Sequence, residues 1–317
     1  MTRYAAVDCG TNSIRLLIAD VVDGQVTELH RTMEIVRLGQ GVDATGSLAP
    51  EAIARTREAL ERYVDMMAFE HVTTVRMVAT SASRDADNRD EFFDMTAQLL
   101  GRIQPGARAE VITGEEEAEL SFRGAVADLD AQRGPFCVVD LGGGSTEFVV
   151  GNEDGIRGEL STRMGCVRLT ERILRSDPPT PEEIEEARDY VRGQLALVLD
   201  AVPVAQARTL VGCAGTFTTL SALAQGLETY DPAAIHGSEL NFGALRVMTS
   251  QLISEGAATR ALNPVIHEGR ADVIGSGSVI VEEIMDFMGY HAGVESVVIS
   301  EKDILDGIID KLAAPIG

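Results

Sequence analysis

Two short polar segments of this chain carry Asp, Gly and Ser at the same offsets. They are residues 8–13 and 140–145, separated by 132 positions. An apolar run precedes and follows each segment, which predicts a strand, a tight glycine turn and a second strand. Glycines in such a turn expose backbone N–H groups that can bind phosphate oxygens. The repeat therefore predicts two phosphate-binding loops, formed by Gly10, Thr11, Asn12 and Ser13 and by Gly142, Gly143, Gly144, Ser145 and Thr146.

Carboxylates stand beside both predicted loops. Asp8 and Asp140 each follow the first apolar run, and Glu147 follows the second loop. A carboxylate next to a bound phosphate repels it unless a cation or a water lies between them. These three side chains are therefore candidate ligands of Mg²⁺. The alternative is a plain glycine hairpin with Asp as a turn residue. It explains either loop alone but not the matched pair.

The first half of the chain offers charged candidates of its own. Arg84 follows three small residues and could bind phosphate through two N–H groups. The alternative is a surface Arg paired with Asp85 or Asp87. The acidic run 115–117 opens a predicted helix. It could supply a general base for water, or it could be the negative charge that helix N-termini favour.

A further glycine-containing segment, 212–216, could bring the backbone close to a nucleotide base or ribose. As a lone motif it is weak; its candidate residues are Gly212, Gly215 and Thr216. Two better-known phosphate motifs are excluded. The chain has no Gly-x-x-x-x-Gly-Lys sequence followed by Ser or Thr. The triple glycine of the second loop leads into a strand and not a helix, so it is no dinucleotide fingerprint.

The elements that carry these residues also repeat. Hydrophobic periodicity and turn signals predict the order β-β-β-α-β-α-β-α in each half. In the first half the strands after the loop are 16–22, 26–35, 75–79 and 110–112, and the helices are 50–68, 89–100 and 115–126. In the second half the strands are 148–151, 156–164, 209–212 and 297–299, and the helices begin at 181, 217 and 302. Small-residue turns at 80–84 and 213–216 precede the second helices, and a mainly helical insertion occupies about 230–293.

Antiparallel hairpins followed by βαβ units predict an α/β fold with mixed sheets flanked by helices. We expect two tandem domains, residues 1–128 and 129–299, joined near 128–135. Clefts between domains are favoured ligand sites. The active site is therefore expected in the cleft between the two domains.

Composition limits the classes of partner. The 317 residues carry a formal net charge of −23, and 4% of them are aromatic. Such an acidic chain disfavours nucleic acid and anionic membranes as partners. A polyanionic substrate would need local Arg side chains, N–H groups and a cation. We expect no signal peptide and no membrane span. The four cysteines form no C-x-x-C pair, which favours a cytoplasmic location.

Together these motifs resemble the exopolyphosphatase / guanosine pentaphosphate phosphohydrolase family. The segments that carry the resemblance are 8–20, 79–85, 115–118, 140–147 and 212–219. The family belongs to the actin-like superfamily. The first residues of this chain are most similar to the short actinobacterial exopolyphosphatases of the family. The resemblance implies two actin-like (ribonuclease H-like) domains, with the last helix, about 300–317, packed on the first. It also implies Mg²⁺-dependent hydrolysis of the terminal phosphoanhydride bond of inorganic polyphosphate, with release of orthophosphate.

The resemblance assigns roles to particular residues. The catalytic Glu of the family precedes an Ala-Arg pair, which points to Glu117 before Ala118, although Glu119 stands here in place of the Arg. Asp140 is the second expected catalytic residue, and it would hold the metal ion together with Glu147. Longer relatives carry an additional helical C-terminal region that helps bind long chains. We expect that region to be absent here, which argues against processive action on very long polyphosphate.

Other activities stay open on the sequence alone. The same chemistry could act on guanosine pentaphosphate, converting pppGpp to ppGpp. The fold is also compatible with a small-molecule kinase or with a non-catalytic actin-like assembly module. The oligomeric state is also open, and a homodimer is one candidate.

Overall fold

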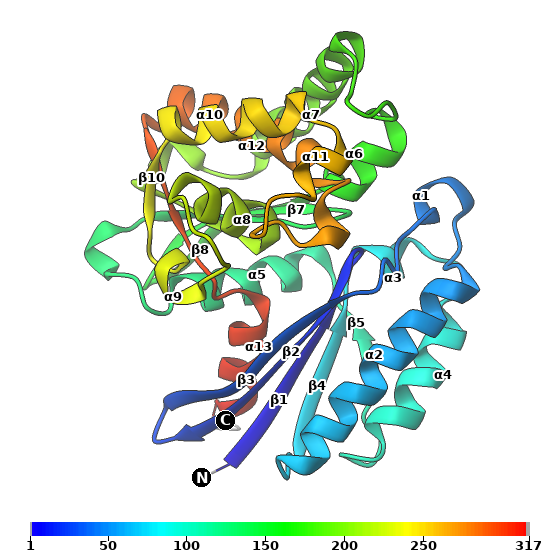
Figure 1. The fold of residues 1–317 in the computed structure, drawn as a ribbon. Coiled ribbons are helices and arrows are strands. Elements are labelled where there is room, and N and C mark those ends of the chain that lie inside the picture. The colour runs from blue at the N-terminus through cyan, green and yellow to red at the C-terminus, as the bar shows by residue number, and fades with distance from the viewer. Residues whose placement is uncertain (1, 315–317) are drawn as a thin grey trace. The chain divides into compact units, whose positions relative to one another are not determined.

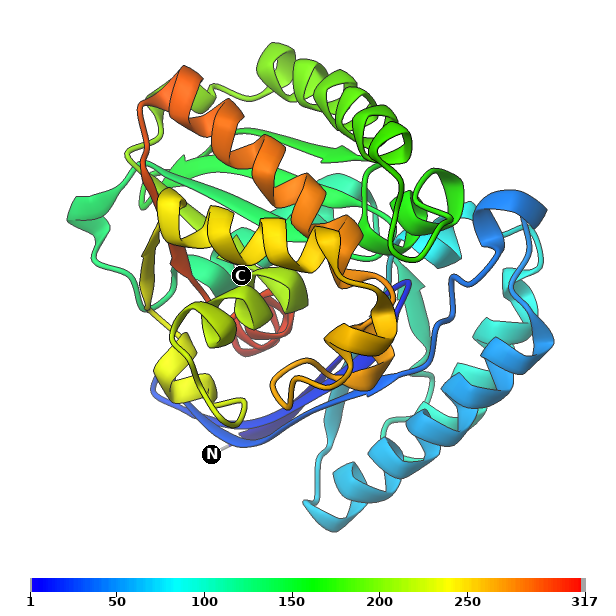
Figure 2. The same ribbon diagram turned by 45° about the horizontal axis from the view of Figure 1, so that its top comes forward.

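A computed structural model describes residues 2–314 of the chain, which separate into two compact units (Figure 1). Unit 1 runs up to Gly124 and resumes at Ile304, and unit 2 comprises Ala125–Asp303. Each unit contains one mixed sheet with helices packed on it, as a second view also shows (Figure 2). The predicted α/β fold class with two mixed sheets is therefore confirmed.

The sheet of unit 1 opens as the predicted meander and continues with parallel strands. Its order is β3-β2-β1-β4-β5; β1, β2 and β3 pair antiparallel, whereas β4 and β5 join in parallel. The strands are β1 Thr2–Cys9, β2 Ser13–Val22, β3 Gln25–Ile35, β4 Thr74–Ala79 and β5 Ala109–Val111. Because β1, β4 and β5 are parallel, the segments that follow them lie at one edge of the sheet.

Alternate residues of these strands face two different layers of helices. Val7 and Leu16 belong to the core formed with α2 and α4, whereas Ala6 and Leu17 belong to the core formed with α5 and α13. The last of these helices follows all of unit 2 in the sequence and still lies against β1 and β2. The helices of unit 1 are α1 Val42–Thr45, α2 Pro50–Phe69, α3 Ser81–Asp85, α4 Arg89–Leu100, α5 Gly114–Val126 and α13 Ile304–Ala313.

Gly307 lets α13 approach α5 closely. A Cβ at this position would lie 2.8 Å from the carbonyl carbon of Leu120 and in collision with its oxygen. These are backbone atoms in a helix, so they cannot rotate aside. We expect Gly307→Ala to lower the free energy of unfolding by about 1–3 kcal/mol, the usual cost of overpacking, as measured by chemical denaturation.

A matched control is Gly193→Ala in the helix Pro181–Ala201 of unit 2. Its Cβ would meet no atom within 4 Å, and Ala is the better helix former. This control should keep or slightly raise the stability. Equal stability of Gly307→Ala and the wild type would contradict the close packing of α13 on α5.

The sheet of unit 2 repeats the same plan and adds one strand. Its order is β10-β11-β9-β6-β7-β8, with β6, β7 and β8 antiparallel and with β9 and β11 joined in parallel. The additional strand, β10, pairs antiparallel with β11. The strands are β6 Phe136–Leu141, β7 Thr146–Asn152, β8 Gly155–Thr162, β9 Thr209–Cys213, β10 Glu239–Asn241 and β11 Ser296–Ile299.

The helices of unit 2 share one large hydrophobic core with one face of this sheet. Helix α7 begins at residue 181, as predicted. The Thr180 side chain accepts a hydrogen bond from the N–H of Glu183, and the Glu183 carboxylate accepts one from the N–H of Thr180. No helix within residues 2–314 has the length and hydropathy needed to cross a bilayer. The helices are α6 Cys166–Arg172, α7 Pro181–Ala201, α8 Ala214–Ala224, α9 Pro232–Ile235, α10 Phe242–Ser254, α11 Ala257–Arg260 and α12 Ile274–Ala292, with short 3₁₀ turns at Ala131–Arg133, Val204–Gln206 and Glu268–Arg270.

Two predicted turns are wrong, since each lies largely within a helix. Residues 81–84 belong to α3, and α8 begins at Ala214 and not at 217. In the second case the Phe217 ring covers Gly212 and the Thr216 side chain packs against Gly277, so packing fixes the helix from its first turn. The insertion 230–293 is mainly helical as predicted, but it also supplies β10, which extends the sheet.

Candidate functional site

The two predicted loops share one backbone geometry. The N–H of Gly10 donates to the carbonyl of Ser13 at 3.0 Å, and the N–H of Gly142 donates to the carbonyl of Ser145 at 3.0 Å. Each bond closes a tight turn between antiparallel strands, β1–β2 in unit 1 and β6–β7 in unit 2. The repeat in the sequence is therefore also a repeat in the structure.

The start of α6 holds the loop of unit 2 from behind. Backbone N–H groups of α6 donate to the carbonyls of Gly142 and Gly143 at 2.9–3.1 Å. The guanidinium Nε of Arg168 donates to the carbonyl of Gly144 at 2.8 Å. In a trans peptide the C=O and the following N–H point in opposite directions. The N–H groups of residues 143–145 therefore point away from α6, and consecutive N–H groups in such an arrangement bind anions.

The loop of unit 1 is held in a similar way by the segment after β3. The carbonyls of Thr11 and Asn12 accept hydrogen bonds from the N–H groups of residues 36, 37 and 39 at 2.8–3.0 Å. The Thr11 hydroxyl is buried, with the residue 8% exposed, and has no hydrogen-bond partner within residues 2–314. A buried hydroxyl without a hydrogen bond lowers the free energy of unfolding by about 1–3 kcal/mol. A phosphate oxygen bound at this loop would satisfy it.

The two aspartates beside the loops face opposite kinds of partner. Asp8 lies across from Arg15, whose Nη2 and Nε donate to Asp8 Oδ2 at 2.6 and 3.0 Å. Asp140 lies across from Glu147, and these residues are only 7% and 2% exposed. Like charges directly opposite each other on adjacent strands are destabilising. A cation bound by these two carboxylates would reduce that repulsion.

The donor set of Asp140 and Glu147 suits Mg²⁺. This ion prefers hard oxygen ligands and is usually bound by one or two carboxylates together with substrate phosphates. The Ser161 hydroxyl donates to Glu147 Oε1 at 2.7 Å and so fixes one carboxylate oxygen. Within the described residues, no group of three or more His, Cys, Asp or Glu side chains is placed to hold a metal ion. Asp140 and Glu147 thus offer carboxylate oxygens of the kind that Mg²⁺ binds.

Arg84 and Glu117, far apart in the sequence, contact each other in unit 1. Nη1 of Arg84 donates to Oε2 of Glu117 at 2.6 Å and to the carbonyl of Ile112 at 3.1 Å. The Arg84 side chain is 22% exposed, so it is not the surface residue of the alternative interpretation. α3 follows β4 and α5 follows β5. Both side chains therefore lie at the sheet edge that carries the loop 10–13.

The three glutamates at the start of α5 have different surroundings. Glu115 is exposed, and its own backbone N–H and the Thr113 hydroxyl hold its pKa below the usual range. Burial acts to raise the pKa of Glu116, but hydrogen bonds and charge from Arg76 and Lys311 outweigh it, and the pKa lies below its ordinary value. Glu117 is the buried member of the run. The environment of Glu117 therefore separates it from its neighbours.

Glu119, which stands in place of the family Arg, is compensated within α5. Its carboxylate forms an ion pair with Arg123, one turn later, at 3.0 Å. Arg123 also reaches Asp310 of α13 at 3.6 Å. The additional negative charge is thus matched by a cation on the same helix.

Internal packing accounts for the small residues of the segment 212–216. A Cβ on Gly212 would lie 2.5 Å from the Phe217 ring, and one on Gly215 would lie 2.6 Å from a guanidinium nitrogen of Arg270. Thr216 is buried and packs against Gly277. The contact with the Phe217 ring explains Gly212 without a nucleotide, whereas Gly215 faces the flexible end of the Arg270 side chain.

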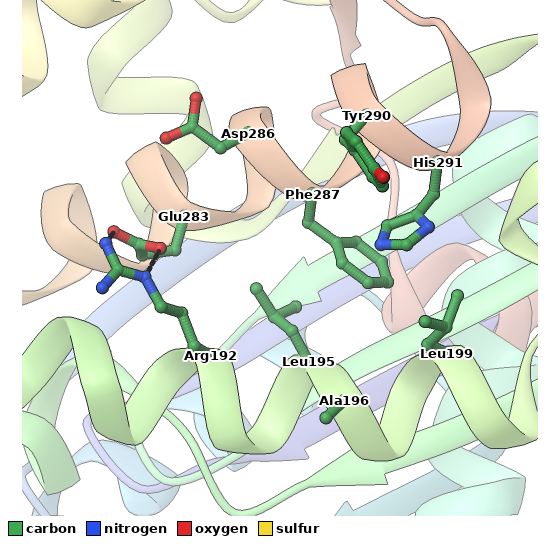
Figure 3. A pocket seen from close by; sticks show the side chains of 9 residues that line it. All are labelled: Arg192, Leu195, Ala196, Leu199, Glu283, Asp286, Phe287, Tyr290 and His291. Atoms are coloured by element: carbon green, nitrogen blue, oxygen red, sulfur yellow. Dashed lines mark hydrogen bonds and ion pairs between the residues drawn. The ribbon is translucent and has the colours of Figure 1, made fainter.

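A cavity of about 320 Å³ in unit 2 is lined by residues of α7 and α12 (Figure 3). Its lining includes Leu195, Leu199, Phe287, Tyr290 and His291. The one arginine there, Arg192, is ion-paired with Glu283. The lining also includes the acidic residues Glu283 and Asp286, whose negative charge disfavours phosphate.

Comparison with known proteins gives the family. The profile of the Ppx/GppA phosphatase family matches residues 17–312. The chain belongs to this family. It is 56% identical over 317 residues to Exopolyphosphatase 2 of Mycobacterium tuberculosis (strain ATCC 25618 / H37Rv), an alignment that covers 99% of each protein.

Two further relatives extend the comparison within the Ppx/GppA phosphatases. The guanosine-5'-triphosphate,3'-diphosphate pyrophosphatase of Vibrio atlanticus is 33% identical over 227 residues, which cover 71% of this chain and 44% of that protein. The crystal structure of an exopolyphosphatase-like protein matches with a TM-score of 0.91 at 39% identity and covers 97% of this chain and 98% of the other. The two-unit fold is therefore that of the family.

Three residues around the loop of this Ppx/GppA phosphatase were missed by the sequence interpretation. Arg168 and Gly165 support the loop from α6, and Ser161 binds Glu147 from β8. Each lies 14 or more residues from the group it contacts, so no local spacing signals it. Gly165 alone gave a usable sign, since a glycine directly before a helix often marks a close approach of the backbone.

Proposed function

We propose that this chain is an exopolyphosphatase, which hydrolyses the terminal phosphoanhydride bond of inorganic polyphosphate and releases orthophosphate. The observation that carries the proposal is the 56% identity over 99% of the chain to a protein named Exopolyphosphatase 2. The anion-binding turn of unit 2 and the Arg84–Glu117 pair of unit 1 supply chemistry that suits it.

The proposed roles follow from the geometry within each unit. The N–H groups of residues 143–145 bind oxygens of the terminal phosphate, and the loop 10–13 offers the Thr11 hydroxyl to another phosphate oxygen. Arg84 neutralises phosphate charge while it positions Glu117. Glu117 accepts a proton from water as the water oxygen attacks the terminal phosphorus and the bridging oxygen leaves with the shortened chain. Phosphoryl transfer depends mostly on positioning and electrostatics, and these residues provide both.

The proposed cofactor is Mg²⁺, held by Asp140 and Glu147. When bound, the ion neutralises negative charge that develops on phosphate oxygens. We assign Asp8 a smaller part, because Arg15 already supplies positive charge to its carboxylate. We also propose a cytoplasmic location and a polyphosphate partner without nucleic acid or membrane, supported by the net charge of −23 and four buried cysteines. A homodimer is the oligomeric state to test first, by light scattering.

The main alternative substrate is guanosine pentaphosphate, which the Vibrio relative's name suggests. This reaction would remove the same kind of terminal phosphate. It would also require a place for the nucleoside, and the segment 212–216 was the candidate. Because the Phe217 ring covers Gly212, we favour polyphosphate.

Orthophosphate release from polyphosphates of defined length tests the proposal. We expect kcat/KM for polyphosphate to exceed that for guanosine pentaphosphate by at least about tenfold, a difference of ~1.4 kcal/mol. A chelator should abolish release and added Mg²⁺ should restore it. Faster turnover of guanosine pentaphosphate would favour the alternative substrate. Phosphate transfer that requires an acceptor molecule would instead indicate a kinase, and the absence of any turnover would favour a non-catalytic module.

A further inference from the structure

Arg168 is a buried cation directly behind the loop of unit 2. The residue is 6% exposed, and its Nε donates to the carbonyl of Gly144 at 2.8 Å. The carbonyls of Gly142 and Gly143 are bound by backbone N–H groups of α6, which any amino acid would supply. The carbonyl of Gly144 is instead bound by a side chain. The orientation of this one peptide therefore depends on the identity of residue 168.

That orientation decides which atom the loop presents to an anion. If the Gly144 carbonyl points toward Arg168, the N–H of Ser145 points away from α6. A peptide that follows glycine rotates more easily than most, because no Cβ restricts it. Rotation of this peptide would replace an N–H donor by a carbonyl oxygen, which repels phosphate. A bond to a permanently charged guanidinium opposes that rotation more strongly than a neutral donor would.

The loop of unit 1 has no such dependence within the described residues. Its Thr11 and Asn12 carbonyls accept backbone N–H groups, and their own side chains restrict rotation. The two loops thus use the same turn with different supports. The loop of unit 2, which contains three consecutive glycines, is the loop that the charged side chain of Arg168 supports.

We infer that Arg168 is a positioning residue that keeps the Gly144–Ser145 peptide in its phosphate-binding orientation and places a positive charge behind the turn. The inference rests on the proposed function, in which this loop binds the terminal phosphate. Arg168 touches neither water nor the scissile bond in this role. It acts through the N–H groups of residues 143–145.

The test compares Arg168→Gln and Arg168→Lys with the wild type in the full-length protein. Titration calorimetry with tripolyphosphate, in the presence of a chelator, measures anion binding without turnover. We expect Arg168→Gln to weaken binding and to lower kcat/KM for polyphosphate, each by at least about tenfold. Arg168→Lys keeps the charge and one donor, so it should recover part of both losses.

A matched control shows whether any effect is merely structural. Arg260→Lys changes another buried arginine whose guanidinium donates to three backbone carbonyls, those of Leu252, Glu255 and Ala271. This variant should lose thermal stability and keep the tripolyphosphate Kd of the wild type. A Kd unchanged in Arg168→Gln, an equal loss in Arg260→Lys, or no binding by the wild type would each overturn the inference. Wild-type binding of tripolyphosphate, without orthophosphate release from polyphosphate when Mg²⁺ is present, would contradict the proposed function alone and leave the role of Arg168 standing.

Discussion

Glu117→Gln is expected to lower kcat for polyphosphate hydrolysis by about 10²–10⁴-fold, the range for removal of a general base. Glutamine has the same shape and can still accept a hydrogen bond from Arg84, which lies 2.6 Å from the carboxylate. It cannot take a proton from water. The loss should therefore appear in kcat, with a smaller change in KM, and steady-state orthophosphate release measures both.

Neighbouring glutamates in the same run provide the controls. Glu115→Gln removes an exposed helix-terminal charge, and Glu116→Gln removes an ion pair with Arg76. Both should keep kcat close to that of the wild type, with at most a modest loss of stability. A folded Glu117→Gln protein with wild-type kcat would remove Glu117 from the mechanism. An equal loss of kcat in Glu116→Gln would show that turnover depends on the total negative charge of residues 115–117 and not on the Glu117 carboxylate alone.

Gly165→Ala is expected to lower kcat/KM by on the order of 10²-fold, although residue 165 contacts no substrate in the proposed mechanism. A Cβ there would lie 2.5 Å from the carbonyl carbon of Gly143 and 2.6 Å from the nitrogen of Gly144. These are backbone atoms of the phosphate-binding turn, so the turn itself must shift. Displacement of a binding group by about 1 Å can cost about 10²-fold in rate.

The backbone of Gly165 is extended, with φ −161°, a conformation that alanine adopts without strain. The effect is therefore purely a collision with the loop. Gly193→Ala, in open space on α7, controls for the change of residue type. Wild-type kcat/KM in Gly165→Ala would mean that the exact position of residues 143 and 144 does not matter for turnover.

Local patterns predicted the parts of this site that are local in the chain. The two strand–turn–strand segments were predicted from glycine and apolar runs, and the start of α7 at residue 181 was predicted from local signals. The residues opposite Asp8 and Asp140 on the neighbouring strands could also have been predicted from the sequence. A tight turn fixes the strand register, so residues 15 and 147 had to lie opposite the aspartates.

Contacts between distant elements were beyond such reasoning. Arg84 approaches Glu117 because β4 and β5 are adjacent and parallel, a pairing that no spacing within either segment encodes. The brace of Arg168 on the second loop arises because α6 folds back behind a turn formed 24 residues earlier. The predicted turn at 213–216 was wrong for a related reason, since tertiary packing by Phe217 and Thr216 overrides the local preference of small residues.

The place of α13 has a consequence for how the protein folds during synthesis. Ile304, Leu305, Ile308 and Ile309 complete a core whose other walls come from β1, β2 and α5. On the ribosome, these residues emerge only after the whole of unit 2 has been translated. Domains usually fold in the order of their synthesis, but here unit 2 has its full core available first. The half of the chain that carries Glu117 and Arg84 must wait, with its hydrophobic face open, for the helix that closes it.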